Sequence, residues 1–149
     1  MLAPNGGGGH LGSGRELWAI RLDGQNVVTD DHVLSKYKRT VPRRPFVLLV
    51  DDLLLMVDDS GVAACVNEKT GREVWTKRLG GNFSSSPIYA DGRIYFFDQN
   101  GKTTVIEAAR QYKVVAINQL DVGFMASPAV SGRALFLRTW LHMYRIAAK

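Results

Sequence analysis

The sequence predicts an all-β fold, a partial β-propeller of about three to three and a half four-stranded antiparallel blades. Three observations support this fold class: one phrase recurs along the chain, its prolines are evenly spaced, and hairpin turns divide each copy. The prolines are Pro45, Pro87 and Pro128, with spacings of 42 and 41 residues. Four short strands in a period of about 40 residues are typical of a propeller blade.

The first 15 residues are expected to form a flexible, Gly-rich lead-in to a folded unit over 16–149. This segment reads MLAPNGGGGHLGSGR, and glycine-rich runs of this kind are typical of flexible linkers. It has neither a basic start nor an apolar core, so it is not a signal peptide.

The first blade is expected over 16–40. We assign 17–22 to its third strand and 32–39 to its fourth strand, with Tyr37 at a position where an aromatic residue is expected. The alternative is an insertion within one long connection.

A ten-residue match between SGRELWAIRL and TGREVWTKRL, at 13–22 and 70–79, argues for a different assignment. However, Trp18 lies 27 residues before the next repeat proline, whereas Trp75 lies only 12 residues before its own. We therefore interpret the match as a partial coincidence of letters.

The second blade is expected over 44–79 and the third over 86–120. Apolar runs of about five residues, rich in β-branched and aromatic side chains, are typical of strands. In the second blade these runs are 46–50, 53–57, 62–66 and 73–77. Asp91-Gly92 and Asn100-Gly101 supply the positive φ angles that tight hairpins in the third blade require.

The last blade, 127–149, is expected to hold three strands and to lack its outer strand. No propeller closes with so few blades. We therefore expect either a fragment whose N-terminal half of the ring lies elsewhere, or a homo-oligomer in which two copies join.

The segment CVNEKTGREVW, 65–75, is similar to the repeat of the quinoprotein-like (PQQ-binding-like) β-propeller superfamily. That repeat reads Ala-x-Asp-x-x-Thr-Gly-Lys-x-x-Trp. Three residues match it, namely Thr70, Gly71 and Trp75. Three residues depart from it, namely Cys65, Asn67 and Arg72. The resemblance covers about 16–147 and implies the C-terminal portion of a secreted bacterial propeller, periplasmic or extracellular.

The resemblance also raises the question of a cofactor. Quinone-dependent dehydrogenases of this superfamily hold PQQ over Ca²⁺ with adjacent cysteines, a stacked Trp and acidic residues. This chain has one cysteine, Cys65, and its Asp pairs lie in expected turns, where Asp bonds to the backbone. We therefore expect no catalytic, cofactor or metal residues, and we interpret Trp18, Trp75 and Trp140 as packing residues between blades.

A protein or peptide partner is the remaining expectation, bound by the loops that lead into each inner strand. The candidate residues are Asn82, Phe83, Phe124 and Met125. An exposed Phe and Met in equivalent loops would suit a peptide; alternatively, these side chains fill the axis. The leading hypothesis is a non-catalytic binding or assembly scaffold. The alternative is the C-terminal part of a PQQ-dependent dehydrogenase whose active site lies in a missing N-terminal half.

Charge and hydropathy argue against two further classes, a nucleic-acid-binding protein and a membrane-spanning one. The net charge is +5 and the pI about 9.6, but the one basic cluster, over 36–44, is broken by Pro42 and followed by Pro45. It predicts a solvated loop rather than a nucleic-acid site. No stretch approaches the roughly 18 apolar residues of a membrane helix.

Overall fold

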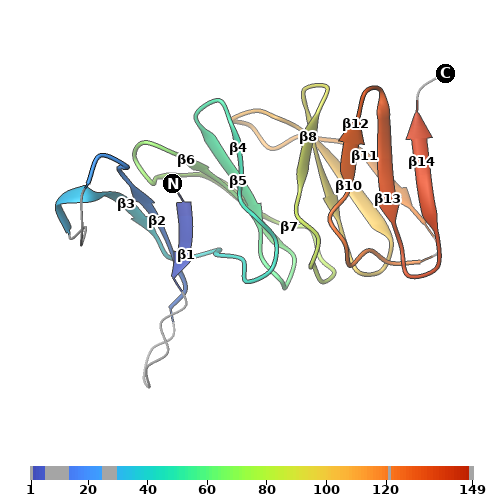
Figure 1. Cartoon of the computed structure of the whole chain (residues 1–149), viewed down its shortest axis with the longest axis horizontal. Coiled ribbons are helices and arrows are strands. Elements are labelled where there is room, and N and C mark those ends of the chain that lie inside the picture. The colour runs from blue at the N-terminus through green and yellow to red at the C-terminus, as the bar shows by residue number, and fades with distance from the viewer. Residues whose placement is uncertain (1, 6–13, 25–29, 121, 148–149) are drawn as a thin grey trace.

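The computed structural model describes residues 2–5, 14–24, 30–120 and 122–147. In this part of the chain, 14 strands form four antiparallel sheets, and the one helical segment is the short 3-10 helix Asp30–His32. The sheets stand in sequence order, one beside the next (Figure 1). The expected all-β partial propeller is therefore confirmed. No helix among the described residues is long and apolar enough to cross a membrane.

The first sheet contains a strand that the sequence analysis does not predict. Its strands are β1 (Leu2–Asn5), β2 (Glu16–Ile20) and β3 (Val33–Tyr37), in the order β1-β2-β3. β1 pairs antiparallel with β2, with Leu2 opposite Ala19. The expectation of a flexible lead-in is therefore wrong over β1, because this segment supplies the second strand of the blade; residues 6–13 lie outside the described part.

The second and third sheets are complete four-stranded blades with the same order of strands. The second sheet comprises β4 (Leu48–Val50), β5 (Leu53–Val57), β6 (Val62–Asn67) and β7 (Glu73–Arg78). The third comprises β8 (Ile88–Ala90), β9 (Arg93–Phe97), β10 (Lys102–Glu107) and β11 (Val114–Gln119). Asp51 and Asp91 begin equivalent turns, and each has a φ of 52°.

The last sheet has three strands in the described residues. They are β12 (Ala129–Ser131), β13 (Ala134–Arg138) and β14 (Met143–Ala147). The first sheet thus lacks an inner strand and the last sheet an outer strand in the described part of the chain. These two sheets form the opposite ends of the row (Figure 1).

A β-bulge fixes which strands are equivalent. The third strand of a blade shifts register after Cys65 in β6 and after Val105 in β10. β2 carries the same shift after Ala19, so β2 is a third strand. Trp18 therefore lies in a third strand and Trp75 in a fourth, which confirms that the ten-residue match is coincidental.

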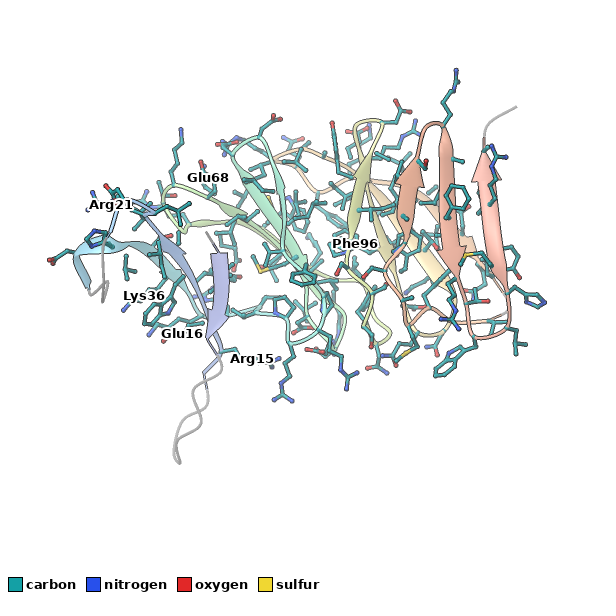
Figure 2. The ribbon with its side chains drawn as sticks, in the orientation of Figure 1. Arg15, Glu16, Arg21, Lys36, Glu68 and Phe96 are labelled. Carbon is teal, nitrogen blue, oxygen red and sulfur yellow. The ribbon has the colours of Figure 1, made fainter. Side chains whose placement is uncertain are left out.

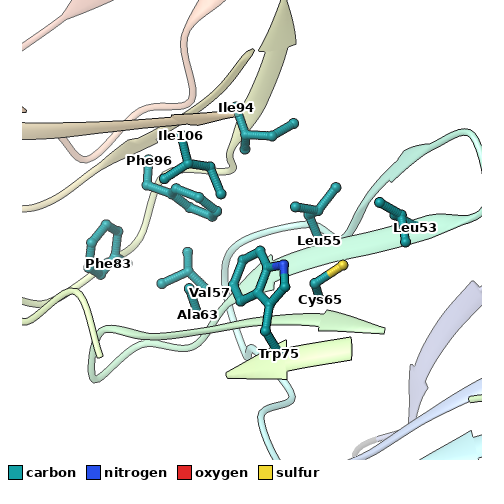
Figure 3. Close-up of a cluster of buried hydrophobic side chains, with 10 residues drawn as sticks. All are labelled: Leu53, Leu55, Val57, Ala63, Cys65, Trp75, Phe83, Ile94, Phe96 and Ile106. Carbon is teal, nitrogen blue, oxygen red and sulfur yellow. The ribbon is translucent and has the colours of Figure 1, made fainter. Parts of the chain in front are cut away.

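The core lies at the interfaces between neighbouring sheets, here called seams. Figure 3 shows the seam between the second and third sheets, where Leu55 and Trp75 face Ile94, Phe96 and Ile106. Smaller clusters occupy the other two seams. Because each sheet buries apolar residues on a neighbour, the loops at the ends of the strands are held at fixed positions.

Candidate partner-binding loops

Two kinds of loop meet at one end of the sheets. One kind leads from an outer strand to the next inner strand, and the other joins the second and third strands of a blade. Backbone bonds join them: the Phe83 amide donates to the Asp59 carbonyl (3.1 Å), and the Phe124 amide donates to the Asp98 carbonyl (3.2 Å). We call this end the loop face; it comprises 40–45, 58–61, 79–87, 98–101, 122–128 and 139–142.

The two aromatic candidates, Phe83 and Phe124, are buried rather than exposed. Phe83 is 1% exposed and Phe124 is fully buried. Phe83 fills the seam between the second and third sheets, and Phe124 packs edge-on against Phe97 with centroids 5.3 Å apart. Their backbone bonds turn the side chains inward, where these side chains hold the loops in place.

The other two candidates, Asn82 and Met125, lie beside these anchors and are exposed. Val41 is the equivalent anchor of the first connection, and it is also buried. An apolar residue recurs four positions before each repeat proline. That recurrence is the sequence signal that distinguishes an anchor from a contact residue.

The expected turn role of Asp58 is confirmed, and Asp98 repeats it. Asp58 Oδ1 accepts bonds from the amides of Ser60 (2.9 Å) and Val62 (3.0 Å). Asp98 Oδ1 accepts from the amides two and four residues later, at 2.9 and 2.8 Å. These carboxylates hold their own turns, and among the described residues no group of three or more His, Cys, Asp or Glu could hold a metal ion.

The basic cluster predicted over 36–44 is largely paired with acidic residues. Lys38 Nζ lies 2.7 Å from Glu16 Oε1, and Arg44 Nε lies 4.0 Å from Asp59 Oδ1. Lys36 Nζ lies 4.3 Å from the centroid of the Trp18 ring, and Figure 2 shows Lys36 and Glu16 on the first sheet. This pairing is typical of a solvated surface and offers no continuous track for a phosphate backbone.

Two serines link the blades beside the axis. The Phe46 amide donates to Ser86 Oγ, and the Ser86 amide donates to Ser127 Oγ, each over 2.9 Å. Each hydroxyl precedes a repeat proline. The bonds hold successive inner strands at a fixed spacing, and so they hold the loops that precede these strands.

Cys65 is a small packing residue in the seam between the second and third sheets. It is fully buried in the seam, and burial raises the pKa of its thiol to about 11. A thiol with so high a pKa stays protonated near neutral pH and is a poor nucleophile or metal ligand.

The last sheet carries an exposed apolar group that the sequence analysis does not identify. Trp140, Leu141 and Met143 are 64%, 74% and 67% exposed. Trp140 is therefore not a packing residue between blades, whereas Trp75, at 8%, is one. Beside Trp140 lies a hollow of about 180 Å³, and its lining residues are Met125, Ala126, Arg138, Thr139 and Trp140.

Comparison with known proteins identifies similar folds. Residues 10–139 match the PQQ_2 family model, described as outer membrane protein assembly factor BamB. BamB from Moraxella catarrhalis has a TM-score of 0.66 at 14% identity over 85% of this chain and 35% of that chain. A europium-containing methanol dehydrogenase has 0.57 at 11% over 72% and 22%. The computationally designed Ika4 protein has 0.58 at 12% over 91% and 80%.

These matches confirm the expected resemblance to PQQ-like β-propeller repeats. No curated protein sequence matches the chain. At such low identities the solved structures show the fold alone. The chain spans about a third of the BamB structure that it matches, whereas it spans most of the designed protein.

Proposed function

The chain belongs to the PQQ_2 family of outer membrane protein assembly factor BamB, and from this premise we propose that it is a non-catalytic scaffold that binds a protein partner. The family description further suggests a role in outer membrane protein assembly, which would place the scaffold in the bacterial periplasm. Both the role and the compartment are parts of the proposal.

The loop face carries this proposal. Buried anchors such as Phe83 and Phe124 fix loops that expose Asn82 and Met125 beside them. A surface whose backbone is already ordered loses little conformational entropy when a partner binds. Loops held by a rigid scaffold are also the usual place for binding residues.

A PQQ-dependent dehydrogenase is the competing function, and it is favoured by the likeness to a methanol dehydrogenase. The described residues do not fit PQQ over Ca²⁺. The single cysteine and Trp75 are both buried in a seam, so neither can face a quinone on the axis. The described residues hold no acidic cluster to bind the calcium ion, so an active site of this kind would need residues from elsewhere.

Site-specific photo-cross-linking in the producing bacterium tests the scaffold proposal. A photoreactive residue replaces Asn82 or Met125 on the loop face, and the matched control replaces Asp91, which is exposed in a turn at the opposite end of β9. We expect a discrete cross-linked protein from the first two positions and none from the third. Equal cross-linking from Asp91, or none from the loop face, would contradict the proposal.

Addition of PQQ and Ca²⁺ tests the competing function on the same protein. Dye-linked oxidation of methanol or glucose is measured with and without the additions. We expect no turnover above background. Clear PQQ-dependent turnover would show that the chain is catalytic and would overturn the non-catalytic assignment.

A further inference from the structure

The last sheet has one face that packs on the third sheet and one that does not. Leu135, Leu137 and Tyr144 lie on the packed face, against Tyr95 and Phe97. Side chains alternate along a strand, so the opposite face carries the residues between them. We call it the back face. Its members on β13 and β14 are Ala134, Phe136, Arg138, Met143, Arg145 and Ala147, and the register pairs Phe136 with Arg145 and Arg138 with Met143.

The back face differs chemically from the two equivalent faces inside the molecule. Arg138 ends the second strand of its blade, and Arg145 lies opposite the middle of that strand. The residues at these two positions in the second and third sheets are Val57, Cys65, Phe97 and Val105. All four are at most 4% exposed, and Val57, Cys65 and Phe97 belong to the apolar clusters of the seams. Arginines at both positions make the back face unsuited to another sheet of the same kind.

The positive charge of the arginines on the back face is not balanced by any acidic residue of the last blade. Between residues 122 and 149 the sequence contains no Asp or Glu, but it contains Arg133, Arg138, Arg145 and Lys149. Arg138 and Arg145 are diagonal neighbours across the strand pair, a relation that places Cα atoms about 7–8 Å apart. Neither guanidinium makes a hydrogen bond or ion pair with any other described residue.

Apolar side chains lie directly beside these charges. Arg138 lines the 180 Å³ hollow together with Met125 and Trp140. Met143 lies opposite Arg138 in the register and is 67% exposed. Tryptophan and arginine are both among the residue types that are enriched at protein binding hot spots.

Resting on the proposed function, we propose that the back face and its hollow bind an acidic protein segment that carries an apolar side chain. Carboxylates of this segment pair with Arg138 and Arg145, and the apolar side chain enters the hollow beside Trp140. Charge complementarity sets the orientation and encounter rate of such an interface, and the apolar contact contributes most of the affinity.

A second copy of this chain is a poor occupant of the back face. The exposed face of the first sheet carries Lys36 and Lys38, with Glu16 already bonded to Lys38 and Trp18. Head-to-tail contact would therefore bring lysines toward Arg138 and Arg145, and like charges across an interface are unfavourable. This argues against the homo-oligomer, which is one of the two assemblies that the sequence leaves open.

Fluorescence anisotropy with short labelled peptides tests the proposal on the whole chain at low salt. The probe alternates glutamate with leucine, and two control peptides replace either glutamate by lysine or leucine by serine. We expect the glutamate–leucine peptide to bind at least about tenfold more tightly than either control. Its affinity should fall as salt is added, because salt screens exposed charges.

Matched variants locate the site. Arg138→Glu should weaken binding of the glutamate–leucine peptide about tenfold, and Trp140→Ala about fivefold or more. Arg133→Glu is the control, since it makes the same charge change on an exposed residue at the other end of β13 and should change the affinity less than about twofold. Circular dichroism confirms that each variant is folded.

Three results would overturn the proposal. The first is equal weakening by Arg133→Glu and Arg138→Glu, which would mean a response to net charge alone. The second is binding of single-stranded DNA as tight as binding of the peptide, which would indicate a polyanion site. The third is no preference for the glutamate–leucine peptide. None of these results bears on cross-linking from Asn82, which does not line the hollow, so the two proposals fail separately.

Discussion

Replacement of Trp75 by alanine tests how far stability depends on the seam between the second and third sheets. The Trp75 ring is 8% exposed and packs edge-on against Tyr112, with centroids 5.2 Å apart. Its Nε1 donates to the Ala109 carbonyl over 3.3 Å. The side chain therefore joins β7 of one blade to the loop after β10 of the next.

The expected loss follows from the surface that the ring hides. A buried tryptophan removes about 150–250 Å² from water, and at about 25 cal/mol per Å² this area contributes about 4–6 kcal/mol. That figure is an upper bound, because the unfolded chain already hides part of the surface. The indole hydrogen bond is long, and the partly exposed Ala109 carbonyl can bond to water instead. We therefore expect Trp75→Ala to lower the free energy of unfolding by about 3–5 kcal/mol.

Equilibrium urea denaturation followed by far-UV circular dichroism measures this loss. Trp140→Ala is the matched control, because the same truncation on a ring that is 64% exposed should cost less than about 1 kcal/mol. Trp75→Phe gives a smaller loss that can be measured even if the alanine variant does not fold. An unchanged midpoint for Trp75→Ala, or equal losses for both alanine variants, would refute the assignment of Trp75 to the seam.

Three further perturbations test the loops and the core. Gly101→Ala should lower the melting temperature more than Gly92→Ala. A Cβ at Gly101 would meet the Leu120 carbonyl oxygen at 2.2 Å, whereas a Cβ at Gly92 would meet no atom within 4 Å. Equal shifts in melting temperature would contradict the close approach at Gly101. Phe83→Ala should cost about 3–5 kcal/mol in urea denaturation and Asn82→Ala less than about 1; the reverse order would show that the phenylalanine is exposed. Burial raises the pKa of the Cys65 thiol to about 11, so the thiol ionises at a lower pH in the unfolded chain than in the folded chain. The free energy of unfolding should therefore fall as pH rises from the usual thiol pKa toward 11. Cys65→Ala should lack this decline in urea titrations across that range, and a parallel decline in both proteins would refute it.

The sequence predicts the blades well because their signals are local and repeated. The prolines and the Asp-Gly and Asn-Gly turns mark strand boundaries that are determined within a few residues of the chain. The sequence analysis does not predict β1, because the glycine run after Asn5 resembles a linker. Its four residues follow the pattern of 55–58 in the second blade, so alignment of MLAPN with LLMVD would have revealed the strand.

The candidate site is harder to predict, because exposure depends on where a loop turns. Phe83 and Asn82 are adjacent, and only the backbone bonds to a neighbouring loop decide which side chain is buried. Trp75 and Trp140 are both expected to pack between blades, yet one faces a neighbouring blade and the other faces solvent. The unusual placement of Arg138 is recognised only from the strand register, which puts this arginine at the position that Val57 and Phe97 occupy in the other blades. No local sequence pattern shows this equivalence.

The confinement of the core to seams makes the chain a one-dimensional array in thermodynamic terms. In such arrays stability is close to a sum of repeat energies and nearest-neighbour coupling energies, and the serine bonds from Phe46 to Ser86 to Ser127 belong to the coupling. Within the described part of the chain, the two central repeats have two neighbours each and the two end repeats have one each. Amide hydrogens of β5, β6, β9 and β10 should therefore exchange most slowly, while the end sheets fray at a lower free energy. A ligand on the last sheet would slow exchange there first, and this protection would decay from blade to blade toward the first sheet.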